Sequence, residues 1–184
     1  AGGVIGLYYN KMMNKLESSE AEKNKWRSRI SKEIELAVKV QENFIPKRNL
    51  ENYPVKGINI PAREVSGDFF SFYPNNENIY FIIADVAGKG IHAGMVMAKA
   101  STLFEVLSQG KVDLDEMVFH MNNDLFNTKT GGMFVTGIIG NYDIISEEIK
   151  WVNAGHQPAL IRHTKGNFEE FESKSPPLGV IFQK

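Results

Sequence analysis

The sequence predicts an α+β fold, a layered β-sandwich of mostly antiparallel strands flanked by helices and preceded by a long N-terminal linker helix. Three observations predict it. A charged segment near the N-terminus lacks glycine and proline, short apolar runs separated by turn residues follow it, and two successive helical patterns interrupt those runs. A doubly wound parallel sheet would alternate strands with single helices instead.

The composition is that of a globular chain with room for one main domain. The chain has 184 residues, of which 42% are hydrophobic and 23% charged, with no cysteine and a net charge of −1. This length suits one domain of roughly 100 to 150 residues plus an appendage. The lack of cysteine excludes disulfides and thiolate metal sites and favours a reducing, cytoplasmic location. The balanced charge argues against a nucleic-acid partner.

The first ten residues allow two interpretations. The run VIGLYY (4–9) is apolar and is followed by Lys11 and Lys15, as at the cytoplasmic end of a membrane helix. A tag remnant or an ordinary helix start explains the same residues. Because the chain starts at Ala1 rather than Met, we expect a fragment, either free in the cytoplasm or the cytoplasmic portion of a membrane-anchored protein with a sensor domain upstream.

Residues 11–48 predict a long helix. They contain ten Lys or Arg and six Glu, with no glycine and no proline before Pro46. Their apolar side chains follow the spacing of a coiled coil, at Trp26, Ile30, Ile34, Ala37 and Phe44, with Gln41 as the polar member of the stripe. The stripe is narrow, so it fits either a two-stranded coiled coil that makes a homodimer or a helix lying on its own domain.

Residues 49–184 predict the domain itself. Alternating apolar patterns predict strands at 57–60, 69–73, 79–86, 134–142, 149–153, 159–163 and 168–172. Between the third and fourth strands, a helix over 92–108 would bury Ala93, Val96, Ala100, Leu103 and Leu107. A second helix would begin at Asp113, with Glu116 completing a capping box, and would bury Leu114, Met117, Met121 and Leu125.

Two carboxylates stand at the ends of predicted strands. Asp68 precedes one strand, and Asp85 ends the most hydrophobic one, just before Gly88-Lys89-Gly90. If the two strands are neighbours, both carboxylates meet at one edge, where a divalent cation would offset their desolvation. Hard oxygen ligands favour Mg²⁺ or Mn²⁺. Arg63 could grip a phosphate. Either aspartate alone could also be an ordinary turn or capping residue.

Other kinds of site fit less well. The segment GKGIHA (88–93) matches a dinucleotide-binding pattern, but Asp85 would face the pyrophosphate and a second helix follows where a strand should. A Walker loop is excluded because Gly rather than Ser or Thr follows Gly88-Lys89. The four histidines show no metal-binding spacing, and the chain has no G-x-S-x-G motif.

The chain resembles the PPM-type metal-dependent protein serine/threonine phosphatases, in the bacterial branch that includes the stage II sporulation phosphatase and the activators of general-stress sigma factors. The segments PAREVSGDFF (61–70) and DVAGKG (85–90) are similar to its two acidic motifs. NAGHQP (153–158) and PLG (177–179) resemble its later landmarks, and ELAVKVQENFIP (35–46) resembles the helix that precedes the catalytic domain. Together they occur in the family's order and spacing.

The resemblance implies a site for two Mn²⁺ or Mg²⁺ ions. Asp85 would bridge the metals, the carbonyl of Val86 would bind one of them, and Asp68 would ligate directly or through water. The substrate would be a phosphoserine or phosphothreonine on a regulatory partner of the anti-sigma-factor antagonist type. His156 could serve as a general acid, but we expect it to stabilise a turn.

Two departures from the family pattern are visible. Ser71 stands where many relatives have another aspartate, a change that we expect to be tolerated. The chain also stops at Lys184, before the Thr-Asp-Gly strand whose aspartate completes the metal site in the family. We therefore expect a C-terminally truncated domain with an incomplete site. The alternative is a catalytically silent dimeric module with a phosphatase-like surface.

Overall fold

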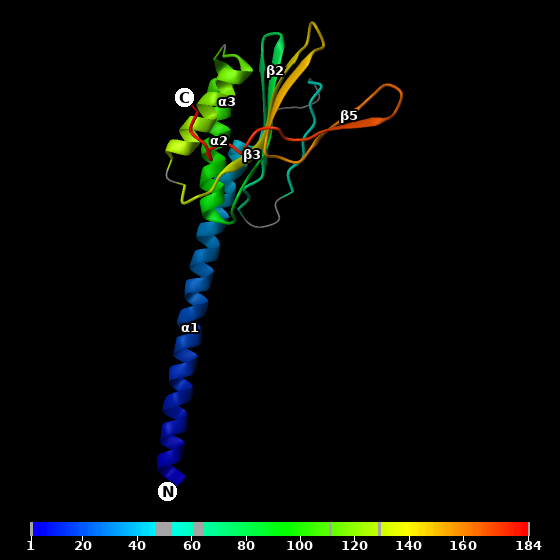
Figure 1. Cartoon of the computed structure of the whole chain (residues 1–184). Coiled ribbons are helices and arrows are strands. Elements are labelled where there is room, and N and C mark those ends of the chain that lie inside the picture. The colour runs from blue at the N-terminus through cyan, green and yellow to red at the C-terminus, as the bar shows by residue number, and fades with distance from the viewer. Residues whose placement is uncertain (1, 47–52, 61–64, 111, 129, 184) are drawn as a thin grey trace.

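The computed structural model describes residues 2–46, 53–60, 65–110, 112–128 and 130–183. It consists of a folded domain and a long helix, α1, that projects from it as a single rod (Figure 1). In the domain, helices and an antiparallel sheet form separate layers, so the predicted α+β class is confirmed.

Helix α1 spans Gly2–Gln41, and the short 3-10 helix η1 (Glu42–Phe44) continues it. The helix therefore begins earlier than the predicted start at Lys11 and ends before Pro46, because Ile45 adopts the extended backbone favoured by a residue that precedes proline. The predicted end at Arg48 lies outside the described residues. Trp26 and Ile30 are exposed, and only the last turns of α1 reach the domain. Within the described part of the chain, no helix is long and apolar enough to cross a membrane.

Four strands form the main sheet, in the order β1-β2-β3-β4, with every neighbouring pair antiparallel. They are β1 (Phe69–Asn75), β2 (Asn78–Val86), β3 (Val135–Asp143) and β4 (Ile149–Ala154). The predicted strand at 57–60 is wrong, because these residues form no strand pairing and lie instead against the start of β1. A Cβ on Gly57 would overlap the ring of Phe70, and Asn59 Nδ2 donates to the carbonyl of Asp68 (3.0 Å).

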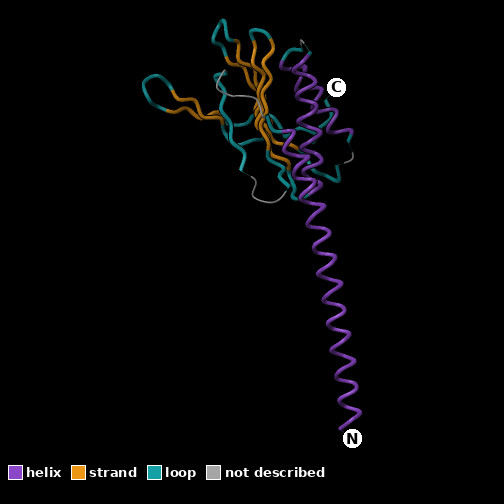
Figure 2. The backbone as a smooth tube through the Cα atoms, turned by 180° about the vertical axis from the view of Figure 1, so that it is seen from behind, coloured by secondary structure: helices purple, strands orange, loops and turns teal. Residues whose placement is uncertain are grey.

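Helices α2 (Ile91–Gln109) and α3 (Leu114–Asn127) cover one face of this sheet (Figure 2). The predicted inward face of α2 is rotated slightly, since Met97 and Phe104 are fully buried while Leu103 and Leu107 lie at the rim of the core. Asp113 occupies the N-cap position of α3 as predicted, but its side chain makes no capping hydrogen bond.

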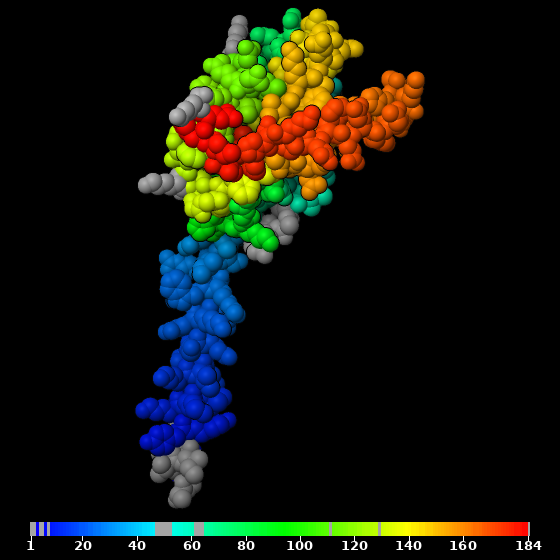
Figure 3. Space-filling model, viewed as in Figure 1, coloured from blue at the N-terminus to red at the C-terminus, as the bar shows by residue number. Residues whose placement is uncertain are grey.

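A second, two-stranded sheet consists of β5 (Ala159–Arg162) and β6 (Phe168–Phe171). This hairpin extends from the body of the domain (Figure 3) and contacts the main sheet through Trp151 and Phe171, whose ring centroids lie 5.3 Å apart. After it, Leu178 pairs with Val135 beside β3, and Asn122 of α3 accepts a hydrogen bond from the Gly179 N–H (3.0 Å). The last described residues are thus tied to both layers.

Candidate functional site

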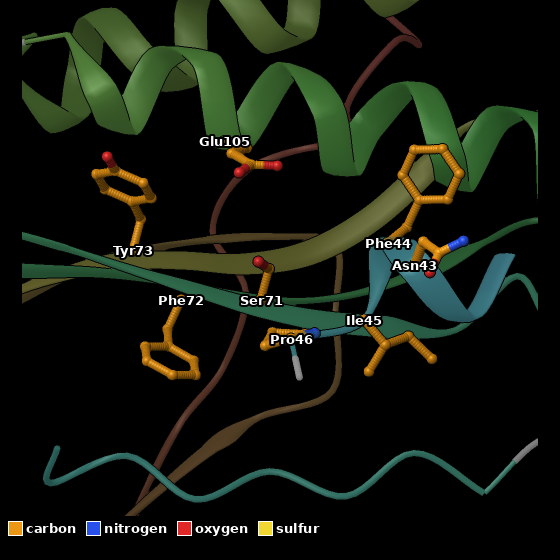
Figure 4. A pocket seen from close by; sticks show the side chains of 8 residues that line it. All are labelled: Asn43, Phe44, Ile45, Pro46, Ser71, Phe72, Tyr73 and Glu105. Carbon is orange, nitrogen blue, oxygen red and sulfur yellow. The ribbon is translucent and has the colours of Figure 1, made fainter. Parts of the chain in front are cut away.

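The register of β1 and β2 brings the two predicted carboxylates together. Phe69 pairs with Ala84, so the preceding residue, Asp68, comes opposite Asp85. In β2 the residues on either side of Asp85 are buried against the helices, so its own side chain points to the other face. Figure 4 shows the same alternation in β1, where Ser71 and Tyr73 point toward α2 and Phe72 points away.

Asp68 and Asp85 line a groove of about 420 Å³ together with the loop from Val86 to Gly90. Both aspartates are exposed. Partial burial, a hydrogen bond with the carboxyl group of Asp68 and the charge of that group together raise the pKa of Asp85 to about 6. The surroundings thus do not neutralise the negative charge of the two carboxylates, and a divalent cation bound near them would offset their repulsion.

Local contacts hold Asp68 at the edge of the sheet. Ser66 Oγ accepts a hydrogen bond from the Asp68 N–H (3.0 Å) and lies 3.3 Å from the Asp68 carbonyl oxygen. Gly67 lets this loop lie close to the end of β2, since a Cβ at this position would lie only 3.2 Å from the carbonyl oxygen of Val86. Gly88 and Gly90, which line the same groove, have positive φ angles (145° and 75°), which only glycine adopts readily.

The end of helix α1 contacts this loop through Gln41. Its Nε2 donates to the Ser66 carbonyl (2.6 Å), and its Oε1 accepts from the Ser66 N–H (3.0 Å). The next turn is anchored as well, because Ser101 Oγ of α2 donates to the Phe44 carbonyl (3.2 Å) and the residues from Asn43 to Pro46 lie beside β1 and α2 (Figure 4). Sequence reasoning noted Gln41 only as a polar residue in an apolar stripe.

Thr136 and His156 extend the site across the sheet. Thr136 of β3 pairs with Asp85, and its Oγ1 lies 3.0 Å from Nδ1 of His156. His156 and Asp68 line a second, smaller groove of about 140 Å³. Sequence reasoning considered His156 but missed Thr136, whose only signal is a hydroxyl in an otherwise apolar stretch of strand.

The other two predicted site residues are Val86 and Arg63. Val86 is buried at the wall of the larger groove. The carbonyl oxygen of Val86 lies close to Gly67, so it faces the loop that carries Asp68. Arg63 lies outside the described residues. Among the described residues no group of three His, Asp or Glu side chains could hold a metal ion. Asp68 and Asp85 are the two carboxylates that the structure brings together at the predicted site. Paired carboxylate oxygens beside a backbone carbonyl fit Mg²⁺ or Mn²⁺.

Comparisons with known proteins find relatives in sequence and in fold. Phosphoserine phosphatase RsbU of Bacillus subtilis (strain 168) is 29% identical over 154 residues, which cover 82% of this chain and 46% of RsbU. The SiaA-PP2C domain of Pseudomonas aeruginosa has a similar fold (TM-score 0.68, 14% identity, 83% of this chain and 64% of that one). RsbX in complex with magnesium is also similar (TM-score 0.57, 18% identity, 69% of this chain and 61% of that one).

This chain spans less than half the length of RsbU. The family model described as Stage II sporulation protein E (SpoIIE) matches residues 75–183, which include Asp85, Thr136 and His156. The match covers more than half of the chain and confirms the resemblance inferred from the motifs. The chain therefore belongs to the stage II sporulation protein E (SpoIIE) family.

Proposed function

We propose that this chain carries part of the catalytic domain of a metal-dependent protein serine/threonine phosphatase, which hydrolyses phosphoserine or phosphothreonine on a regulatory partner. The observation that carries the proposal is the placement of Asp68 opposite Asp85 on an open groove. The name of the relative RsbU, a phosphoserine phosphatase, and the magnesium complex of RsbX support it.

In this mechanism Asp68, Asp85 and the Val86 carbonyl would provide part of a site for two Mg²⁺ or Mn²⁺ ions. When bound, such ions activate a water and neutralise the phosphoryl oxygens. Residues of the chain itself position these groups. Ser66 Oγ accepts a hydrogen bond from the Asp68 N–H and so orients Asp68, and the glycines beside Lys89 leave the groove open to the phosphate. Lys89 is the only cation among the described residues that line this groove, so it attracts the substrate dianion. Arg63 is proposed as a second phosphate ligand from the sequence alone.

The partner is proposed to be a phosphorylated anti-sigma-factor antagonist, and helix α1 is proposed to transmit a signal from an upstream sensor or membrane segment. Gln41 supports this second part. Its amide binds both backbone groups of Ser66, two residues from Asp68, so a displacement of the helix end would be passed directly to the metal-binding loop.

Helix α1 is also proposed to dimerise as a coiled coil. Its exposed apolar side chains support this, since Trp26 is 63% and Ile30 49% exposed in the single chain. Replacement of Ile30 or Ile34 by Asp should weaken a dimer measured by light scattering, whereas Lys32→Asp, on the charged surface, should not. A wild-type chain that stays monomeric at micromolar concentration contradicts the coiled coil.

The catalytic proposal is tested by phosphate release from a phosphoserine protein, with this chain and with a chain extended through the family's Thr-Asp-Gly strand. We expect release that depends on Mn²⁺ and falls at least about 100-fold in Asp85→Asn. Glu105→Gln, on the helix-covered side, is the matched control. An Asp85→Asn rate equal to wild type contradicts the proposal. No release from either chain, with weak metal binding, would favour a catalytically silent module.

A further inference from the structure

A further groove, of about 380 Å³, lies beside the candidate metal site. It is formed by the end of α3, the loop that joins α3 to β3, and the segment after β6, and we call it the α3 groove. Its largest lining side chains are Phe126, Met133 and Phe134, and none of the described residues that line it is charged. The α3 groove therefore offers an uncharged, largely apolar surface.

The α3 groove shares a boundary with the groove that contains Asp68 and Asp85. The N–H of Ala87, in the metal-site loop, donates to the carbonyl of Phe134 (2.8 Å). Met133 completes the boundary, because it lines the α3 groove and a Cβ on Gly88 would lie 3.0 Å from its Sδ atom. A peptide bound in the larger groove can therefore continue over Met133 into the α3 groove.

The walls of the α3 groove are held in place by contacts between elements. Val135 exchanges two backbone hydrogen bonds with Leu178 (2.8 and 3.1 Å), which fixes the segment after β6 beside the start of β3. Lys99 of α2 contacts both Asp124 and Thr128 at the end of α3, so these two opposite charges are paired with each other. The groove is thus formed before any partner binds, as is usual for ligand sites.

Apolar side chains gather at the rim of this groove and remain open to solvent. Phe126 is 43% and Val180 45% exposed, and the ring of Phe182 lies 5.6 Å from that of Phe126. Figure 3 shows the last described residues, in red, at the surface beside the loop that leads into β3. Grouped, exposed apolar side chains are typical of a surface that binds another molecule.

We propose that the α3 groove binds an apolar side chain of the phosphoprotein substrate, a few residues from its phosphorylated serine or threonine. This inference rests on the proposed phosphatase function and adds a specificity determinant to it. An apolar occupant suits the uncharged lining, where a charged side chain would lose water without gaining a partner. An extended peptide advances about 3.3 Å per residue, so a side chain that lies just beyond Met133 belongs within about four positions of the phosphorylated residue.

The test uses phosphoserine peptides of alanine and serine that carry one leucine. The leucine is moved from four positions before the phosphoserine to four positions after it, and a peptide without leucine is the reference. Binding of fluorescently labelled peptides to the full chain is measured by anisotropy in the presence of Mg²⁺. We expect leucine at one or two positions to raise the affinity by about 5- to 50-fold.

Two variants of the rim test whether the α3 groove causes this preference. Val180→Asn and Phe126→Ser should each reduce the preference for leucine to less than about twofold, while the affinity for the leucine-free peptide stays within about threefold of wild type. Both side chains are partly exposed, so each variant should fold, and the two are independent. Ile145→Ser is the matched control, since Ile145 is also exposed but lies beyond the opposite end of β3, and it should keep the preference.

The inference is overturned if no peptide binds, if no position of leucine improves binding, or if the preference survives in both rim variants. It is also overturned if the chain self-associates in light scattering, Phe126→Ser abolishes this and no peptide shows a preference, because the groove is then a contact between copies.

Phosphate release from the same peptides with Mn²⁺ is measured separately. A preference for leucine that depends on the rim, without any release, means that the phosphatase function fails while the binding role of the groove stands. Release without a preference means that the inference fails alone. When both hold, the leucine should lower KM and leave kcat within about threefold, because it binds substrate and transition state alike.

Discussion

Replacing Gln41 by Ala should weaken both the fold and the candidate metal site. The side-chain amide makes two hydrogen bonds to Ser66, of 2.6 and 3.0 Å, at a half-buried position. At about 0.5–1.5 kcal/mol for each bond, their loss should cost about 1–3 kcal/mol of unfolding free energy. For a chain of this size that corresponds to a fall in Tm of about 2–10 °C. The freed loop should also bind Mn²⁺ more weakly, because Ser66 orients Asp68.

Differential scanning calorimetry measures the first effect and a Mn²⁺ titration the second. Val40→Ala is the matched control, since Val40 is on the same turn and 60% exposed, so its truncation should change the Tm by less than about 2 °C. Gln41→Glu keeps an acceptor for the Ser66 N–H but sets a carboxylate oxygen against the Ser66 carbonyl, so it should resemble Gln41→Ala. If Gln41→Ala behaves like Val40→Ala in both measurements, the contact does not couple the helix to the site.

Three further predictions concern the sheet. Because the folded chain raises the pKa of Asp85 to about 6, the metal-free chain loses stability as the pH rises from about 4 to 6. Asp85→Asn should therefore raise the free energy of unfolding of the metal-free chain at pH 7 by about 1 kcal/mol, after allowance for solvent screening, and should not raise it at pH 3. Guanidinium unfolding with EDTA measures both values, and equal effects at the two pH values would refute this. Hydrogen bonds from the N–H groups of Ser146 and Ile145 lower the pKa of Asp143, so Asp143→Ala should destabilise the chain at pH 7 and lose its effect as the pH falls below about 3 in thermal melts; a pH-independent effect would point to another cause. In Gly140→Ala the new Cβ would lie 2.7 Å from the Lys150 carbonyl and overlap the ring of Phe81, which should cost about 1–3 kcal/mol by urea unfolding; an unchanged midpoint would mean that β4 yields.

The order of elements and the two carboxylates could be predicted because each has a local signal. Strand β2 is an uninterrupted apolar run that ends in a charge, and α2 and α3 have clear helical periodicity. Two strands joined by the short turn at Asn76 are neighbours in almost any sheet, so the meeting of Asp68 and Asp85 followed from connectivity.

One predicted strand is wrong and two side-chain contacts were missed, because each depends on residues that are far apart in the sequence. Residues 57–60 alternate like a strand, but they cover the ring of Phe70 instead of pairing with a neighbour. The contact between Gln41 and Ser66 joins positions 25 apart, and the contact between Thr136 and His156 joins positions 20 apart. Such contacts leave no periodic pattern in a single sequence, because each joins two individual side chains that are far apart along the chain.

The positions of the site residues imply where a signal from α1 would act. Asp85 and Thr136 lie opposite each other in the pairing of β2 with β3. Their relative position could change only by a register shift, which would move every side chain of a strand to the other face of the sheet. Asp68 differs, since it precedes β1 and is held by Ser66, whose backbone is in turn held by Gln41. A small movement of the helix end can therefore change the separation of the two carboxylates without breaking a strand pair. Metal affinity, rather than folding, is the quantity that such a movement should regulate, and it should do so through Asp68.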